Sequence, residues 1–150
     1  MMNRITKVAV MFAILMDLAG CVTMTPVTLN ESNVALLQGQ WHGTWRSQFG
    51  DSGNDFQLII DNVDTAGNVT GTRTAASPSA HLYGRFRISG KLEDGKLFLP
   101  EGTGKSAWLR LELRYDAENK EHWLTGSYSI IAVNAGGRIV TGTLDLKKVK

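Results

Sequence analysis

The sequence predicts an all-β domain, and we expect its strands to close into an eight-stranded antiparallel up-and-down β-barrel. Apolar and polar side chains alternate with a period of two through much of the chain after residue 39. Turn-forming residues interrupt this alternation at short intervals, and glycines stand inside several of the expected strands. These three observations indicate short, hairpin-connected strands wrapped around one core.

The alternation is clearest over residues 55–63 and 107–115. Large apolar side chains occupy every second position there, and polar side chains fill the positions between them. Residues 82–92 repeat the pattern, with Phe86 and Ile88 expected to face the core. The full set of expected strands is 40–49, 55–63, 68–75, 82–92, 96–99, 107–115, 121–132 and 138–148.

Turn signals separate these strands. Asp94 and Gly95 form the Asp-Gly pair that is typical of a two-residue hairpin turn. Because connections of this kind are short, neighbouring strands are expected to pair antiparallel. Comparable polar, glycine-containing or asparagine-containing segments lie at 50–54, 64–68, 116–120 and 134–137.

The edges of the sheet decide between two architectures. A meander of eight strands leaves two unpaired edges unless its first strand pairs with its last. Gly71, Gly126 and Gly142 stand inside expected strands, where glycine is typical of bends or of close backbone approach. We therefore expect a closed barrel, and an open β-sandwich of the same strands is the alternative.

The first twenty residues have the pattern of a secretory signal. Arg4 and Lys7 precede an almost wholly apolar run over residues 8–18. As a helix this run would span only about 16 Å, which is short of the roughly 30 Å hydrocarbon core of a bilayer. We therefore expect the segment to be removed rather than to remain as a membrane span.

The tetrapeptide Leu18-Ala19-Gly20-Cys21 resembles the lipobox of bacterial lipoproteins. The resemblance implies cleavage before Cys21, diacylglycerol on its sulfur, and a further acyl chain such as palmitate on its freed amine. Several acyl chains give stable membrane anchoring where one does not. Val22 stands where Asp would favour the inner membrane, so the same resemblance implies the outer membrane, with the domain facing the periplasm.

The chain is thus expected to contain three parts. They are a signal peptide over 1–20, a lipidated cysteine with a polar tether over 21–38, and the β-barrel domain over 39–150. Asn30 is a candidate N-cap for one helical turn within the tether. The alternative interpretation is an ordinary secretory signal followed by a free thiol at Cys21, or a buried helix over 8–19.

A motif in the first strands resembles the opening of the avidin family and its calycin relatives. It consists of Gly43-Thr44-Trp45, a strand and a turn, and then residues 67–72 with the sequence Gly-Asn-Val-Thr-Gly-Thr. The resemblance implies an eight-stranded up-and-down barrel with a ligand site inside it.

The same resemblance implies that the site differs from that of the avidins. Ser47 stands where avidins carry Asn, and Arg73 stands where they carry Tyr, so biotin is not the expected ligand. Arg73 would meet an anionic ligand, or it is an arginine of the barrel rim or one paired with another side chain. Together with Trp45 and Tyr128, these two residues form the candidate ligand-binding set.

Trp108 and Trp123 are expected on the outer wall instead. Both fall out of phase with the leucines of their strands, so the alternation directs them away from the core. Exposed tryptophans on neighbouring strands would form a contact patch for a protein partner.

Composition argues against several other classes of function. The net charge is +2, and basic residues alternate with acidic ones, which is not the basic stripe that binds nucleic acid. His42, His81 and His122 lie on different segments without metal-ligand spacing, and no group of residues forms a catalytic motif. We therefore expect no enzyme activity, no cofactor, no metal site and no nucleic-acid partner.

The leading hypothesis is a non-enzymatic envelope lipoprotein whose barrel binds a small ligand or a protein partner. One alternative is a structural or inhibitory lipoprotein that docks onto a periplasmic enzyme or assembly. Another is a lipocalin-like lipid carrier, which would need an apolar cavity of several hundred Å³. Whether the barrel interior is open or filled distinguishes these hypotheses. An open pocket favours a small ligand, and a filled interior favours docking of a protein.

Overall fold

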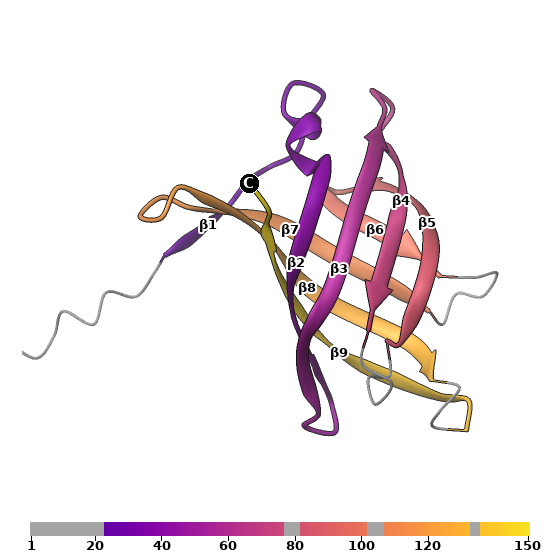
Figure 1. The fold of residues 1–150 in the computed structure, drawn as a ribbon. Helices are drawn as coiled ribbons and strands as arrows, with labels where there is room; N and C mark the ends of the chain where they lie inside the picture. The colour runs from indigo at the N-terminus through magenta and orange to yellow at the C-terminus, as the bar shows by residue number, and fades with distance from the viewer. Residues whose placement is uncertain (1–22, 77–81, 102–106, 133–135) are drawn as a thin grey trace, which may run out of the picture.

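The computed structural model describes residues 23–76, 82–101, 107–132 and 136–150, and most of these lie in β-strands (Figure 1). The elements are β1 Met24–Pro26, the 3-10 helix η1 Val34–Leu37, β2 Gly39–Ser47, β3 Ser52–Val63, β4 Asn68–Ala75, β5 Gly84–Glu93, β6 Lys96–Pro100, β7 Trp108–Asp116, β8 Glu121–Ala132 and β9 Arg138–Lys148. The expected strands are present, and their boundaries differ from the expected ones by three residues or fewer.

The sheet closes into a barrel of the eight strands β2 to β9. Each strand pairs antiparallel with the next, and β9 pairs back onto β2 from Trp41↔Lys148 to Ser47↔Gly142. This confirms the predicted up-and-down barrel and excludes the open sandwich. The closure is uneven, because β5 and β6 share only three pairs, from Lys91↔Phe98 to Glu93↔Lys96.

The barrel has two unlike ends. We call the end where β2, β4, β6 and β8 finish the mouth, and the opposite end the closed end. At the closed end, η1 packs over the interior with Leu29, Val34 and Leu37 buried (Figure 1). The indole Nε1 of Trp41 donates a hydrogen bond of 2.8 Å to the Leu37 carbonyl oxygen. This contact fixes the cap to the first barrel strand.

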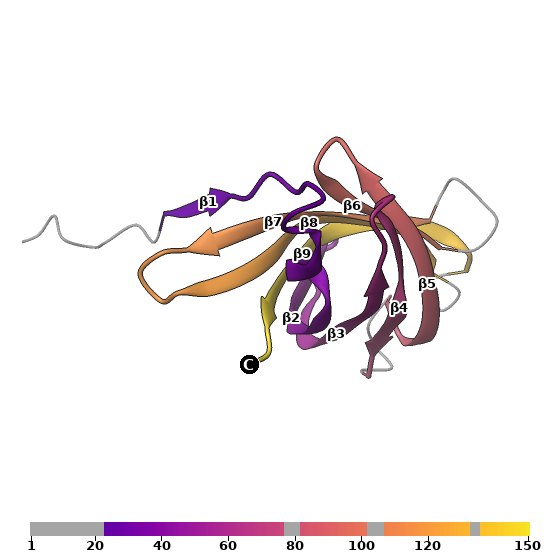
Figure 2. The same ribbon diagram turned by 90° about the horizontal axis from the view of Figure 1, so that it is seen from above.

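The segment expected to be a tether is therefore largely part of the folded domain. β1 pairs with the end of β7, from Met24↔Asp116 to Pro26↔Arg114, and lies beside the β7–β8 hairpin (Figure 2). The segment was predicted to be a tether because most of its residues are polar. A few of its residues are apolar, however, and these pack against the barrel. Asn30 caps no regular helix; its side chain accepts hydrogen bonds from Ser32, and η1 starts only at Val34.

The interior of the barrel is filled mainly by apolar side chains. Apolar side chains from every barrel strand are fully or almost fully buried in the interior, and Ile88 of β5, which is 4% exposed, faces the core as expected. Phe86 departs from expectation, because its side chain is 48% exposed. Phe86 lies nearer the mouth than Ile88, on the part of β5 that has no pairs with β6. These core residues include Trp41, Phe56, Leu58, Ile60, Leu97, Leu99, Leu111, Leu113, Leu124, Leu144 and Leu146.

Glycines inside the strands allow close backbone approach. A Cβ atom on Gly71 would lie 2.0 Å from the Ile59 carbonyl oxygen, and one on Gly126 would lie 2.1 Å from that of Arg110. No side chain fits at such distances, so these positions require glycine. This agrees with the role expected for in-strand glycines in a strongly curved sheet.

Candidate ligand site at the mouth of the barrel

The four residues predicted to bind a ligand all lie in the half of the barrel nearer the mouth. Trp45 and Ser47 come from β2, Arg73 from β4 and Tyr128 from β8, and all four are buried. Period-two alternation directs them inward, in register with the core residues of their strands. The structure therefore gathers them on one inner surface, although β2 and β4 lie on either side of β3.

One wall of this region is a row of residues across β8, β9 and β2. Gly142 pairs with Tyr128 on one side and with Ser47 on the other. Because Gly142 has no side chain, the phenol of Tyr128 packs against its backbone, and a Cβ atom there would lie 2.5 Å from the phenol oxygen. The Ser47 hydroxyl accepts a hydrogen bond of 3.1 Å from the Phe49 backbone N–H.

The Tyr128 hydroxyl lacks a hydrogen-bond partner. Its residue is 0% exposed, and its Oη makes no hydrogen bond to any described residue. A buried hydroxyl without a partner costs free energy, so native proteins rarely retain one unless water, a ligand or a function compensates. Burial raises the pKa of Tyr128 to about 12, and the nearby charge of Asp51 adds to the increase. The phenol is thus neutral at physiological pH and offers an O–H donor.

The side chains next to this row are held by specific hydrogen bonds. Trp45 Nε1 donates to Asp55 Oδ1 at 2.9 Å, and its indole lies over Gly53, where a Cβ atom would come within 2.6 Å of that nitrogen. The indole therefore needs a glycine on β3. This arrangement fixes Trp45 in one orientation.

Arg73 forms a buried ion pair with Glu101, which lies just after β6. Its Nη2 donates to Glu101 Oε2 at 2.7 Å, its Nε donates to Oε1, and its Nη1 donates to the Leu82 carbonyl oxygen. The Arg73 guanidinium also lies 4.3 Å from the ring centroid of Phe86. Among the alternatives expected for Arg73, the structure shows the paired arginine, and Glu101 neutralises its charge inside the barrel.

Sequence reasoning missed Glu101. The pair joins β4 to the end of β6, past the intervening strand β5, and no local pattern in the sequence marks it. The only available signal was indirect, because an arginine on a core-facing position needs a carboxylate or carbonyl partner. That requirement does not say which of the acidic residues provides it.

Exposed apolar side chains surround this region and form what we call the rim. Ile131 of β8 pairs with Ile139 of β9 on the outer wall, so two of these side chains lie together. Large exposed apolar side chains in one area are typical of a surface that contacts a ligand or a partner. The rim consists of Phe49, Tyr83, Phe86, Ile131 and Ile139.

The two outer-wall tryptophans do not lie next to each other. Both face outward as predicted, and both are half-buried. The register, however, pairs Trp108 with Ser129 and Trp123 with Arg114, which places them six positions apart along β7. At about 3.4 Å per residue this is roughly 20 Å, so the two rings do not lie side by side.

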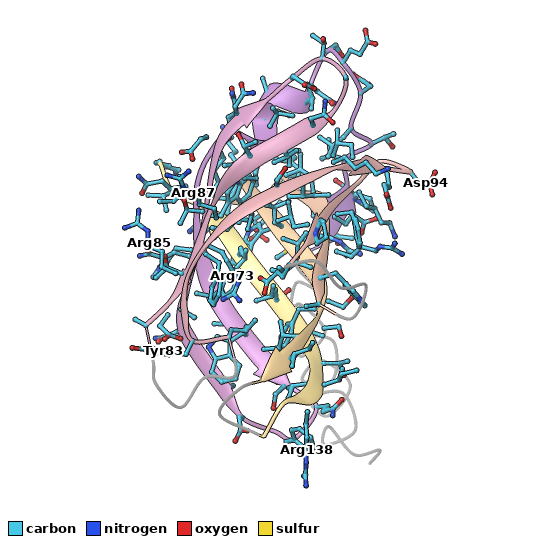
Figure 3. The ribbon with its side chains drawn as sticks, turned by 90° about the vertical axis from the view of Figure 1, so that its right-hand side faces the viewer. Arg73, Tyr83, Arg85, Arg87, Asp94 and Arg138 are labelled. Carbon is cyan, nitrogen blue, oxygen red and sulfur yellow. The ribbon has the colours of Figure 1, made fainter. Side chains whose placement is uncertain are left out.

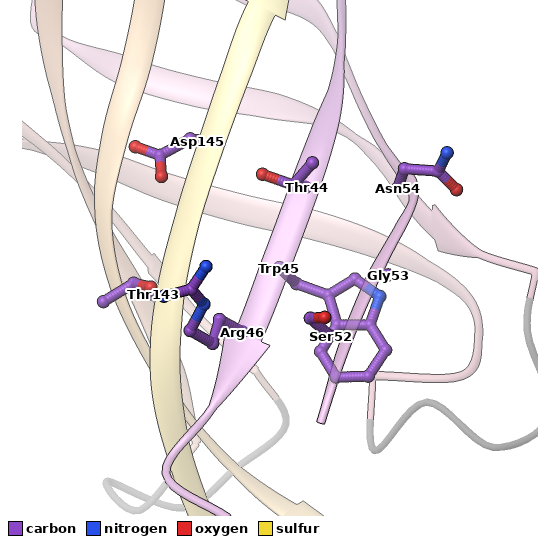
Figure 4. A pocket seen from close by; sticks show the side chains of 8 residues that line it. All are labelled: Thr44, Trp45, Arg46, Ser52, Gly53, Asn54, Thr143 and Asp145. Carbon is purple, nitrogen blue, oxygen red and sulfur yellow. The ribbon is translucent and has the colours of Figure 1, made fainter. Parts of the chain in front are cut away.

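A groove of about 470 Å³ runs along the outer wall where β9, β2 and β3 lie side by side (Figure 4). Arg46 of β2 and Asp145 of β9 line it with opposite charges, and Trp45 reaches its edge above Gly53. Its lining is mainly polar side chains of the outer face. It is therefore separate from the inward-facing set that contains Ser47 and Tyr128.

Two other expectations concern the N-terminus and metals. Cys21, the predicted lipidation site, lies outside the described residues. In the ranges that the structure describes, no helix has the length and apolarity needed to cross a bilayer. Within the same ranges, no three His, Cys, Asp or Glu side chains gather closely enough to hold a metal ion.

Ultraviolet titration of the tyrosines tests the environment of Tyr128. One of the three tyrosines in the chain should form tyrosinate only at about pH 12. The folded-state pKa is raised, so the associated stability is complete below pH 10, the unfolded value, and is lost as the pH rises through 12. The Tyr128→Phe variant should lack this late step, whereas Tyr83→Phe should retain it. A late step that survives in Tyr128→Phe would contradict the assignment.

Comparisons with known proteins give distant structural similarities. No protein-family model and no curated protein sequence matches the chain. Among solved structures, apo shwanavidin has a TM-score of 0.46 at 11% identity, covering 76% of this chain and 97% of that one. A shwanavidin variant in complex with biotin gives 0.46 at 12% identity, with 75% and 97% covered. The rhizavidin–biotin complex gives 0.45 at 15% identity, with 72% and 99% covered.

Proposed function

We propose that this chain is a non-enzymatic envelope lipoprotein, anchored through lipid on Cys21, which binds a small ligand at the mouth of its barrel. The observation that carries the binding proposal is the Tyr128 hydroxyl, a buried donor without a partner among the described residues. A ligand oxygen or nitrogen at this position would accept its hydrogen bond and remove the cost of leaving it unpaired.

The surroundings indicate what such a ligand is like. Glu101 already neutralises Arg73, so the site does not require an anionic ligand. Trp45 is an apolar residue of the same inner face, and the exposed rim offers further apolar surface at the mouth. The site thus fits a small molecule that carries one hydrogen-bond acceptor on an apolar body.

The position of β1 supports an orientation for the anchored protein. Only three residue steps separate Cys21 from Met24, the first residue of β1, and such a segment spans at most about 10 Å. Because β1 is paired with the end of β7, lipid on Cys21 would hold the β7–β8 hairpin close to the membrane surface (Figure 2). The mouth, at the other end of the strands, would then face away from the membrane.

Replacing the candidate lipidated cysteine tests the anchor. The Cys21→Ala variant, expressed with its signal segment in a Gram-negative host, is expected in the soluble periplasmic fraction rather than with membranes. Mass spectrometry of the purified unaltered protein should show acyl chains on Cys21. Continued membrane association of Cys21→Ala, with no lipid mass on the unaltered protein, would contradict the proposal.

Native mass spectrometry of the full-length protein purified from its own membranes tests ligand binding. A bound small molecule should appear with the unaltered protein and be lost or weakened in Tyr128→Phe, which keeps the ring and removes only the hydroxyl. Tyr83→Phe serves as the matched control, because Tyr83 is exposed on the rim. Equal retention in both variants, or none in the unaltered protein, would contradict a site at Tyr128.

Biotin is a useful titrant, and we expect no tight binding because Ser47 and Arg73 replace the avidin pattern.

A second candidate function, docking of a periplasmic protein onto the rim, has a separate observation in its favour. The interior of the barrel is filled mainly by apolar side chains, with Leu58, Leu111 and Leu144 all at 0% exposure. This packing also argues against a lipid carrier, whose acyl chain would need that space. A filled interior and an exposed apolar rim together favour recognition at the surface.

A further inference from the structure

The edge of β5 near the mouth is a feature that the ligand site does not use. β5 pairs with β4 over its length from Gly84↔Ala75 to Lys91↔Asn68, whereas its pairs with β6 begin only at Lys91. Within the described ranges, residues 84–89 therefore have a strand neighbour on one side only. An edge of this kind presents backbone N–H and C=O groups that are ready to pair with another strand.

The side chains along this edge have a distinct pattern. Arg85 and Arg87 are exposed on the outer face and form no ion pair with any described residue (Figure 3). Phe86 between them lies on the inner face, half exposed, with its ring against the Arg73 guanidinium. The edge thus combines two unneutralised positive charges on one face with an apolar surface on the other.

The outer wall beside these arginines is hollowed. A groove of about 810 Å³ is lined by Arg85 and Arg87 of β5, by Thr70 and Thr72 of β4, and by Asp61 of β3. Thr72 stands directly opposite Arg87 in the β4–β5 register. The threonine hydroxyls add hydrogen-bond donors beside the guanidinium groups, and Asp61 contributes the only negative charge in the lining.

The geometry points to strand addition at this edge by an extended, acidic segment of a partner protein. Its backbone would pair with residues 84–89, its acidic side chains would lie on the outer face near Arg85 and Arg87, and its apolar side chains would alternate onto Phe86. Specificity comes from charge, because a second copy of β5 added antiparallel would bring like-charged arginines together. The inference is independent of a ligand at Tyr128, because it uses the edge of β5.

Fluorescence anisotropy with a synthetic peptide tests strand addition. The probe is a labelled eight-residue peptide that alternates glutamate with valine, titrated with the purified full-length protein. We expect saturable binding that weakens as salt rises, together with slower hydrogen exchange of the backbone amides of residues 84–89. Charge reversal in the double variant Arg85→Glu/Arg87→Glu should weaken binding at least about tenfold, since two ion pairs are replaced by repulsion.

Three controls separate strand addition from simple charge attraction. The first is Arg138→Glu, which reverses an exposed arginine at the mouth on β9 and should leave binding unchanged. The second is a peptide with lysine in place of glutamate, which should not bind. The third is a peptide of the same charge with N-methylated backbone amides, which should lose binding because it cannot complete the ladder. Equal binding of the N-methylated peptide, or no protection of residues 84–89, would overturn the inference.

Discussion

Replacing Arg73 with Met is expected to lower the free energy of unfolding by about 3–5 kcal/mol, because it leaves Glu101 without its partner inside the barrel. Arg73 is 3% exposed and Glu101 12%, so water compensates the remaining carboxylate poorly. The substitution also removes the hydrogen bond to the Leu82 carbonyl oxygen and the contact with the Phe86 ring. Chemical denaturation of the purified domain measures the effect. The loss of unfolding free energy is obtained from the shift in the midpoint denaturant concentration, provided that the dependence of this free energy on denaturant is unchanged.

Two comparisons make this prediction specific to a buried pair. The double variant Arg73→Met/Glu101→Gln should recover part of the stability, because no uncompensated charge remains. Arg110→Met removes the exposed pair with Glu93, in which the closest atoms lie 3.9 Å apart, and should cost less than about 1 kcal/mol. Equal losses for Arg73→Met and Arg110→Met would show that the interior ion pair does not stabilise the fold.

The strands were predictable because their signal is local. A half-buried strand repeats its apolar residues every second position, and turns such as Asp94-Gly95 need residues that tolerate a positive φ, which is 50° and 73° at these two positions. Closure was also predictable, because a long unpaired edge is unfavourable in a soluble sheet. The exception is β5, whose edge near the mouth is only partly covered; no local pattern in the sequence distinguishes a covered Phe86 from an exposed one.

The site was only partly predictable because it depends on register between distant strands. Alternation correctly placed Trp45, Ser47, Arg73 and Tyr128 on the inner face, since facing direction is a property of each strand alone. The partner of Arg73 could not be found, because β4 and β6 do not pair with each other and are separated by β5, so no strand register marks the contact. The spacing of Trp108 and Trp123 follows from the β7–β8 register, which separates the two rings although they lie on neighbouring strands.

Replacing Gly71 with Ala is expected to destabilise the protein by about 4 kcal/mol or more, or to prevent folding. A Cβ atom there would lie 2.0 Å from the Ile59 carbonyl oxygen and 3.1 Å from the Ile60 Cα, both backbone atoms that cannot move aside alone. Gly71 pairs with Ile60 next to an irregularity in the β3–β4 register, so relief would require these two strands to separate locally. Circular dichroism during thermal unfolding, compared with the unaltered protein, measures the loss.

Gly136→Ala provides the contrasting case, because it isolates backbone conformation from steric contact. Gly136 has a φ of +68°, and a Cβ atom there would meet nothing within 4 Å. Its replacement should cost only about 1–2 kcal/mol, the penalty of a left-handed conformation for a residue with a side chain. Gly71 does not have a positive φ, so a larger loss at Gly71 would come from the close approach of β3 and β4. Equal, small losses at both positions would mean that the strands can separate without cost and that curvature of the barrel does not depend on this contact.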